Sequence, residues 1–109
     1  MDNETLDGLR RLSGVTAAYI VDQRGVVDGG SEDEVAQVQG GLLAAVVGAL
    51  RQATDSLACG ELTETIVEAE KGAIIAGSLG AGRAAVVLAR DRSSLGMIRV
   101  ELRRLRRGT

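Results

Sequence analysis

The segment from residue 31 to residue 57 constrains the fold most, because it predicts a long helix that is apolar around most of its circumference. It opens with Ser31-Glu32-Asp33-Glu34, a capping-box pattern that satisfies free amides at a helix start. Apolar residues then follow at helical spacing on one face and spread onto neighbouring faces: Val35, Val38, Leu42, Ala45, Ala49 and Ala53, with Leu43, Val46, Val47, Leu50 and Leu57. Such a helix needs cover on more than one side. We expect the protein's own sheet on one side and a second copy of the chain on the other.

Small residues recur every four positions in this helix and form two adjacent rows: Ala36, Gly40, Ala44 and Gly48, then Gly41, Ala45, Ala49 and Ala53. Each internal glycine costs about 1 kcal/mol of helix propensity relative to alanine, so close packing must compensate. Two interpretations remain open. The helix packs tightly on its own sheet alone, or one row meets the sheet and the other meets the same helix of a partner. We favour the second arrangement, which a two-fold axis generates.

The rest of the chain predicts two shorter helices and five strands. The helices cover 3–13 and a segment capped by Ser93 or Ser94, and the strands cover 15–21, 26–28, 61–69, 73–79 and 84–89. Short turns join the strands within each group, so those neighbours pair antiparallel. Three strands are apolar on both faces, which requires helices on both sides of the sheet. We expect one α/β domain over 1–109, with a five-stranded antiparallel sheet in the order 2-1-5-4-3. The long helix covers one face and the two terminal helices cover the other.

Composition excludes several functional classes. The chain has no histidine, so a Ser-His or Cys-His catalytic couple is impossible, and we expect neither a metal site nor a cofactor. The lone Cys59 cannot form an internal disulfide and favours a cytoplasmic location. We expect Cys59 to be a small residue near the end of the long helix. The N-terminus lacks a signal-peptide pattern, and no window is apolar enough to span a membrane.

Four motifs have simple structural interpretations. Gly77–Gly82 resembles a phosphate loop, but Arg83 leads into a strand, so a hairpin is expected. Acidic residues follow Gly29-Gly30-Ser31 and would repel a phosphate there. The acids of the third strand, Glu61, Glu64 and Glu68, keep an edge strand soluble. The arginine run 103–107 suits a helix C-terminus, and without aromatic partners it does not indicate nucleic-acid binding.

The order and spacing of several motifs resemble the bacterial branch of the roadblock/dynein light-chain family. The matching motifs are Leu6-x-x-Leu9-x-x-Leu12-x-Gly14-Val15, the run 17–22 with Gly25, Gly60-Glu61-Leu62, Ile66-Val67-Glu68-x-x-Lys71-Gly72 and Leu95-Gly96-Met97-Ile98-Arg99. The resemblance implies a profilin-like sheet with helices on both faces. It also implies homodimers formed through the long helix and the following edge strand. Such proteins are regulators or scaffolds, not enzymes, and many bind Ras-like small GTPases.

Two sets of site residues follow. The dimer contact is expected at Val38, Leu42, Ala45, Val46 and Ala49, with Ile66 and Val67 of the edge strand. The possible GTPase contacts are Gln37, Gln39, Arg51 and Gln52. Replacing Ala45 or Ala49 with arginine should separate the dimer, because an unpaired charge would enter a desolvated contact.

Two other functions remain as alternatives to this interaction protein. The first is a small-ligand sensor on a similar frame, which needs a partly apolar pocket with convergent polar groups. The second is an acid–base enzyme that uses Glu61 and Glu64, and it is the weaker of the two.

Overall fold

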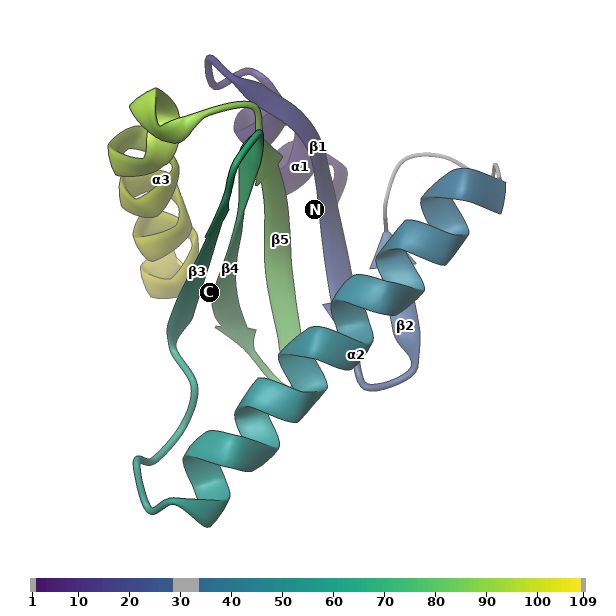
Figure 1. The fold of residues 1–109 in the computed structure, drawn as a ribbon, viewed down its shortest axis with the longest axis vertical. Coiled ribbons are helices and arrows are strands. Elements are labelled where there is room, and N and C mark those ends of the chain that lie inside the picture. Colours follow the sequence, from purple (N-terminus) through teal and green to yellow (C-terminus); the bar gives the residue numbers. More distant parts are fainter. Residues whose placement is uncertain (1, 29–33, 109) are drawn as a thin grey trace.

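A central antiparallel sheet separates one long helix from two shorter ones in the computed structural model, which describes residues 2–28 and 34–108 (Figure 1). In chain order the elements are α1 (Asp2–Arg10), β1 (Val15–Asp22), β2 (Gly25–Asp28), α2 (Glu34–Ser56), β3 (Glu64–Ala69), β4 (Gly72–Gly80), β5 (Arg83–Ala89), the 3₁₀ turn η1 (Arg92–Ser94) and α3 (Leu95–Gly108). The expected Gly29-Gly30 loop and the first three residues of the capping box lie outside the described residues.

The sheet has the order β2-β1-β5-β4-β3, and its two edge strands differ in how many residues they pair with their neighbours. Four strands, β1-β5-β4-β3, form the continuous ladder, with six or seven residue pairs at each junction. β2 pairs with β1 at only three positions, and the register shifts between Ile20 and Val21. The sheet of five strands thus consists of a continuous four-stranded antiparallel ladder and a short hairpin arm, β2, at one edge. The arm is short because four residues beyond a tight turn offer few partners.

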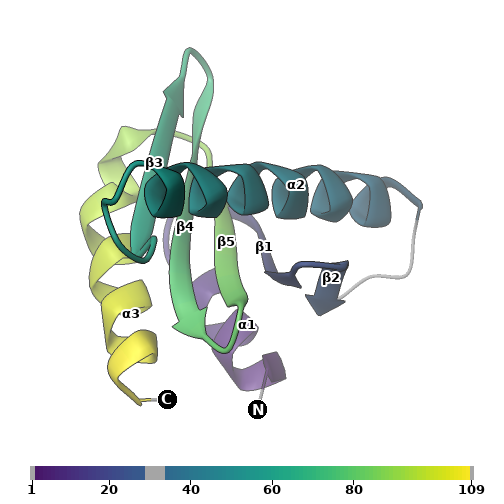
Figure 2. The same cartoon turned by 90° about the horizontal axis from the view of Figure 1, so that it is seen from below.

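The two faces of the sheet carry separate apolar cores. α1 and α3 cover one face through Leu6, Leu9, Ile98 and Leu102, and α2 covers the other through Leu43, Ala44 and Val47 (Figure 2). Alternate residues of the central strands point to opposite faces, as in Ile20 and Val21 of β1. This alternation explains why the three central strands are apolar at nearly every position. Within the described residues, no helix is long and apolar enough to cross a bilayer.

The third strand begins later than its sequence pattern predicts. Residues 61–63 precede β3, whose first residue, Glu64, pairs with Gly77 of β4. Beyond that pair, one further backbone hydrogen bond joins β4 to the segment before β3: the amide of Ser78 donates to the carbonyl of Thr63. An irregularity between Ser78 and Gly80 then re-aims β4 towards its turn with β5, so the edge strand has nothing further to pair with.

The glycine cluster 77–82 is a hairpin, as expected, and not a phosphate loop. Gly80 pairs with Arg83, so Ala81 and Gly82 form a two-residue turn with φ values of 55° and 76°. Positive φ at both positions is the type I′ turn that matches the twist of paired strands. Gly77 has a different role. A Cβ there would lie 3.2 Å from the Cβ of Leu102, so the missing side chain lets α3 approach β4 closely.

The start of the last helix also differs from expectation. Asp91, and not a serine, caps the turn η1 before α3, because its carboxylate accepts from the amide of Ser93 at 2.9 Å. Ser94 is buried, and its hydroxyl donates to the carbonyl of Ser13. Ser94 therefore ties the start of α3 to the turn between α1 and β1.

α2 ends in a Schellman motif that has no glycine in it. The amide of Cys59 donates to the carbonyl of Thr54 at 2.8 Å, and the amide of Ala58 donates to the carbonyl of Asp55 at 3.2 Å. The residue in the left-handed conformation is Ala58, with φ of 58°. The sequence predicted a helix to Leu57, one residue beyond its observed end at Ser56, because alanine gives no signal for this conformation.

Ala58→Gly is expected to stabilise the protein by about 1 kcal/mol, because glycine adopts the left-handed conformation without the Cβ penalty. Thermal unfolding at a fixed protein concentration measures this as a rise of about 4 °C in Tm. Gln52→Gly, at an exposed position in ordinary helix, is the matched control and should destabilise by about 1 kcal/mol. A fall in Tm for Ala58→Gly would contradict the proposed strain.

Candidate interaction surface

The two faces of α2 have opposite environments. Leu43, Ala44 and Val47 are buried against β1, β4 and β5. On the opposite side Val38 is 71% exposed, Leu42 67% and Val46 41%. Ala45 and Ala49 lie among them and are exposed as well. We call these five residues, Val38, Leu42, Ala45, Val46 and Ala49, the outer stripe. Contiguous apolar side chains of this kind on a protein surface mark sites of association.

The glycines of α2 favour an external contact over a purely internal one. A Cβ built at Gly41 or Gly48 meets nothing within 4 Å, so close packing inside this chain does not explain either glycine. The two rows of small residues also separate. In the first row Gly40 and Ala44 are buried but Gly48 is exposed, whereas all four residues of the second row are exposed. The free energy of helix formation that these exposed glycines cost is therefore not offset by contacts among the described residues.

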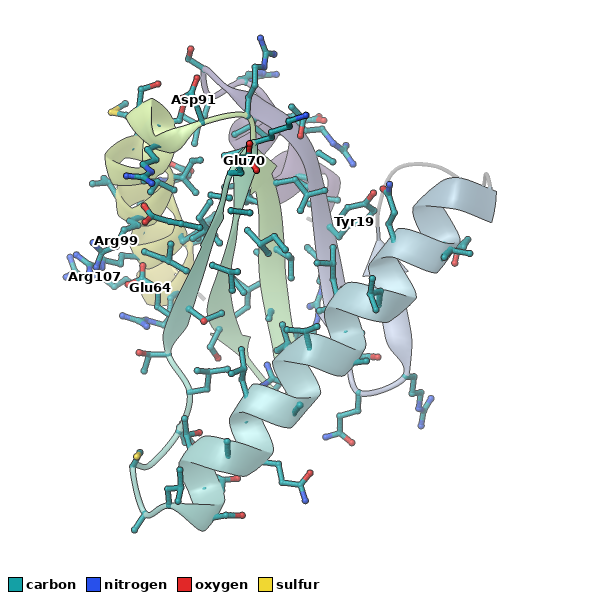
Figure 3. All side chains as sticks on the ribbon, in the orientation of Figure 1. Tyr19, Glu64, Glu70, Asp91, Arg99 and Arg107 are labelled. Carbon is teal, nitrogen blue, oxygen red and sulfur yellow. The ribbon has the colours of Figure 1, made fainter. Side chains whose placement is uncertain are left out.

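Two of the four polar residues proposed to contact a GTPase hold α2 onto the sheet. The hydroxyl of Tyr19, which reaches from β1 towards α2 (Figure 3), donates to Gln39 Oε1 at 2.8 Å. Arg51 donates to the carbonyls of Gly82 and Arg83 at 2.6 and 3.1 Å. The position of Arg51, four residues after the buried Val47, carried the signal for this inward orientation.

The other two polar residues proposed as GTPase contacts are Gln37 and Gln52. Both have exposed side chains on α2. Their exposure means that a partner can reach both side chains.

The two edge-strand residues expected in the dimer contact point to opposite faces. Ile66 pairs with Ile75 and packs against the core under α1 and α3. Val67 is 43% exposed and lies on the side of the sheet that α2 covers, where its pairing partner Ile74 packs. The period-two alternation of a strand separates neighbours in this way. Only Val67 thus shares a face with the outer stripe.

The strand β3 is tied to α3 by ion pairs that the sequence did not predict. Glu64 Oε2 lies 3.1 Å from Arg99 Nη2 and 3.4 Å from Arg103 Nη2, as the labelled side chains in Figure 3 illustrate for Arg99. Partial desolvation raises the pKa of Glu64, but the hydrogen bonds and positive charges of the two arginines outweigh it, so the net pKa is lowered. The expectation that Glu64 only keeps an edge strand soluble is incomplete, because its carboxylate also anchors α3.

The lowered pKa of Glu64 predicts a pH-dependent contribution to stability. The folded pKa lies below the unfolded one, so the contribution is complete above the unfolded pKa and is lost as the pH falls through the folded pKa. The difference in unfolding free energy between wild type and Glu64→Gln should therefore shrink as the pH falls from neutral towards about 3. Urea titrations across this range measure it. The exposed Glu61→Gln controls for removal of one charge at the same edge, and a difference for Glu64→Gln that is constant with pH would refute the prediction.

Two half-open cavities lie where α2 passes the ends of the strands. One has a volume of about 450 Å³ and the other about 360 Å³, and Gln23, Arg51 and Asp55 line both. These volumes fall in the range of small-molecule sites. However, Arg51, the positive charge shared by both, already binds the two carbonyls of the β4–β5 turn. The small-ligand alternative therefore has a space with polar side chains in its lining, but the positive charge common to both cavities is already engaged.

The acid–base alternative has little geometric support. Glu61 is exposed in the segment before β3, while Glu64 is neutralised by two arginines. Such pairing keeps a carboxylate ionised and unsuited to donate a proton near neutral pH. Across residues 2–28 and 34–108, no group of three or more Cys, Asp or Glu side chains is arranged to hold a metal ion.

Comparisons with known proteins agree with this architecture. The Roadblock/LC7 domain of Streptomyces avermitilis superposes with a TM-score of 0.81 at 20% identity, covering 96% of this chain and 91% of that one. MglB of Myxococcus xanthus gives a TM-score of 0.81 at 19% identity, covering 96% and 88%. A structure described as MglB with tetrameric arrangement gives 0.79 at 17% identity, covering 97% and 82%. A comparison with curated proteins finds no match.

At these identities the superpositions establish the fold alone. A match at the level of the family is independent of them and confirms the resemblance noted in the sequence. The description of that family is Roadblock/LC7 domain, and the match extends over residues 1–89. Since this is most of the chain, the protein belongs to the Roadblock/LC7 domain family.

Proposed function

We propose that this protein is a non-enzymatic regulator that forms a homodimer through α2 and binds a Ras-like small GTPase in the cytoplasm. The observation that carries the proposal is the exposure of the outer stripe. Leaving Val38 and Leu42 in water forgoes roughly 1.5–3 kcal/mol for each side chain, which a second copy recovers by covering them. A helix that repeats small residues beside large apolar ones lets a partner helix approach closely.

The edge strand β3 supports the same assembly. It is the outermost strand of the ladder, so one row of its backbone groups has no strand beside it. Val67 adds an exposed apolar side chain on the side covered by α2. A two-fold arrangement that joins two copies of α2 therefore has an adjacent strand edge available to extend it.

Family membership supports the GTPase as partner. Many proteins that this chain resembles bind Ras-like small GTPases, and the MglB structures share its fold. That one MglB has a tetrameric arrangement is also consistent with self-association here. In the proposed complex the chain contributes surface and not a reactive group, and Gln37 and Gln52 are its leading contacts.

The test is nucleotide-dependent binding of the purified dimer to Ras-like GTPases encoded in the same genome. Each GTPase is loaded with GDP or with a non-hydrolysable GTP analogue, and binding is measured by biolayer interferometry. We expect one GTPase to bind more tightly in one nucleotide state. The double variant Gln37→Arg/Gln52→Arg should weaken that binding while the dimer persists, whereas Gln23→Arg at the exposed β1–β2 turn should not. Equal binding to both nucleotide states, or to none of the GTPases, would refute the proposal.

A further inference from the structure

α3 has a second exposed surface, on the side of the molecule away from α2. Met97 and Val100 are each 64% exposed, one turn apart on the solvent side of the helix. Arg104 and Arg107 continue the same line towards the C-terminal end, with Arg103 beside them, and all three are exposed. We call these residues, Met97, Val100, Arg103, Arg104 and Arg107, the α3 surface. Its apolar end and its basic end form one continuous strip.

Charge is concentrated on this helix. α3 carries five of the 13 basic residues of the chain and one of its 15 acidic residues, although the whole protein has a net charge of −2. The single acid, Glu101, is hydrogen-bonded to Arg104. The arginine side chains lie at the margin of the molecule beside α3, where Arg99 and Arg107 are labelled in Figure 3. The helix therefore presents a local positive field on an otherwise acidic protein.

Internal ion pairs account for only part of this charge. Glu64 neutralises one positive charge while contacting both Arg99 and Arg103. Arg103 retains a 47% exposed side chain in that contact. Packing does not explain the apolar end either, because the core contacts of α3 are made by Ile98 and Leu102 on the opposite side of the helix.

We propose that the α3 surface docks on an anionic membrane surface. Three features favour a bilayer over a peptide. α3 stands at the outer margin of the fold in both views (Figures 1 and 2), so it can lie flat on a plane. Neither of the two cavities described above has an α3 residue in its lining, so neither offers this surface a pocket for a peptide side chain. Exposed apolar side chains beside arginines suit the boundary between acyl chains and headgroups.

The acidic remainder of the protein does not prevent this docking. At physiological ionic strength charges are screened over about 8 Å, so the membrane responds mainly to the side chains nearest to it. The stems of Arg103 and Arg107 extend the guanidinium groups towards lipid headgroups while their own methylenes stay near the apolar boundary. The docking orientation leaves α2 facing away from the membrane, and it does not depend on the identity of any GTPase.

The test is flotation of the purified full chain with vesicles of phosphatidylcholine alone or with about one third phosphatidylglycerol. We expect binding to the anionic vesicles only, weakening as salt is added. Arg103→Glu/Arg107→Glu should lower the partition coefficient by at least about 25-fold, since each arginine near an anionic surface contributes about 5-fold. Arg99 remains to pair with Glu64 in this variant. Met97→Ser/Val100→Ser should also reduce binding, because it removes the inserting side chains.

The matched control is Arg24→Glu/Lys71→Glu, which makes the same change in net charge at exposed turn residues outside α3. It should retain nearly wild-type binding, and circular dichroism checks that all variants fold. Absence of wild-type binding to anionic vesicles at low salt overturns the proposal. Equal losses in the control and in the α3 variant overturn it as well. Retention on immobilised polyglutamate without vesicle binding overturns it in favour of an acidic polypeptide partner.

Discussion

Leu42→Arg is expected to convert the protein from a dimer to a monomer. Leu42 is 67% exposed at the middle of the outer stripe, so a single chain tolerates arginine there at little cost. In the proposed dimer the same guanidinium would be desolvated without a partner, which costs about 3–5 kcal/mol. The dissociation constant should therefore rise by at least about 100-fold. Sedimentation equilibrium over a range of concentrations measures this directly.

The matched control for this experiment is Val100→Arg on α3. Val100 is also apolar and 64% exposed, but it lies on the opposite side of the sheet from the outer stripe. The dimer should survive this change. Ala45→Arg and Ala49→Arg should act like Leu42→Arg, because both residues belong to the outer stripe. A wild-type protein that stays monomeric at high concentration, or a Leu42→Arg variant that still dimerises, rules out this interface.

Gly14→Ala is expected to have the largest effect on folding stability. Gly14 has φ of 84°, and an added Cβ would lie 2.2 Å from Ser94 Oγ. The left-handed conformation alone costs alanine about 1–2 kcal/mol. Displacing Ser94 also breaks its hydrogen bond to the carbonyl of Ser13, which costs roughly 1 kcal/mol more. We expect a total loss of about 3 kcal/mol and a fall in Tm of more than about 10 °C.

Gly60→Ala separates the conformational cost from the steric one. Gly60 has a similar φ of 87°, but an added Cβ there meets nothing within 4 Å. Its loss should be limited to about 1–2 kcal/mol. Ser94→Ala in the Gly14→Ala background should cost less than in wild type, because the clashing oxygen is removed. Equal losses for Gly14→Ala and Gly60→Ala would contradict the role assigned to the contact with Ser94.

The sequence predicted the layered architecture because hydrophobic periodicity records burial directly. The runs at β1, β4 and β5 have apolar residues on both sides, which only a sheet covered on both faces accommodates. The length of α2 and the glycine turn between β4 and β5 followed from similarly local signals. The number of residues that each strand pairs with its neighbour could not be predicted in this way, because it depends on segments that are distant in sequence. The sequence predicted a short strand at 26–28, but the number and register of its three pairs with β1 appeared only in the structure.

Side-chain partners were the least predictable part of the candidate site. Arg51 and Gln52 are neighbours of similar polarity, yet Arg51 binds two carbonyls of a distant turn and Gln52 is exposed. Glu64 looked like a solubilising residue until α3 placed two arginines beside it. Ala58 gave no sign that it ends α2, because its conformation is imposed by the surrounding hydrogen bonds.

The sequence by itself determined which residues need to leave water: the strand interiors, one face of α3 and more of α2 than one sheet can cover. It did so because the free energy of burial is a property of each side chain and its spacing along the chain. The sequence also predicted Val38 and Leu42 on the uncovered side of α2, whereas only the tertiary structure showed that Met97 and Val100 stay exposed on α3. The tertiary structure also decided which charges meet. Both outcomes depend on how segments distant in sequence lie against one another, which no local pattern specifies.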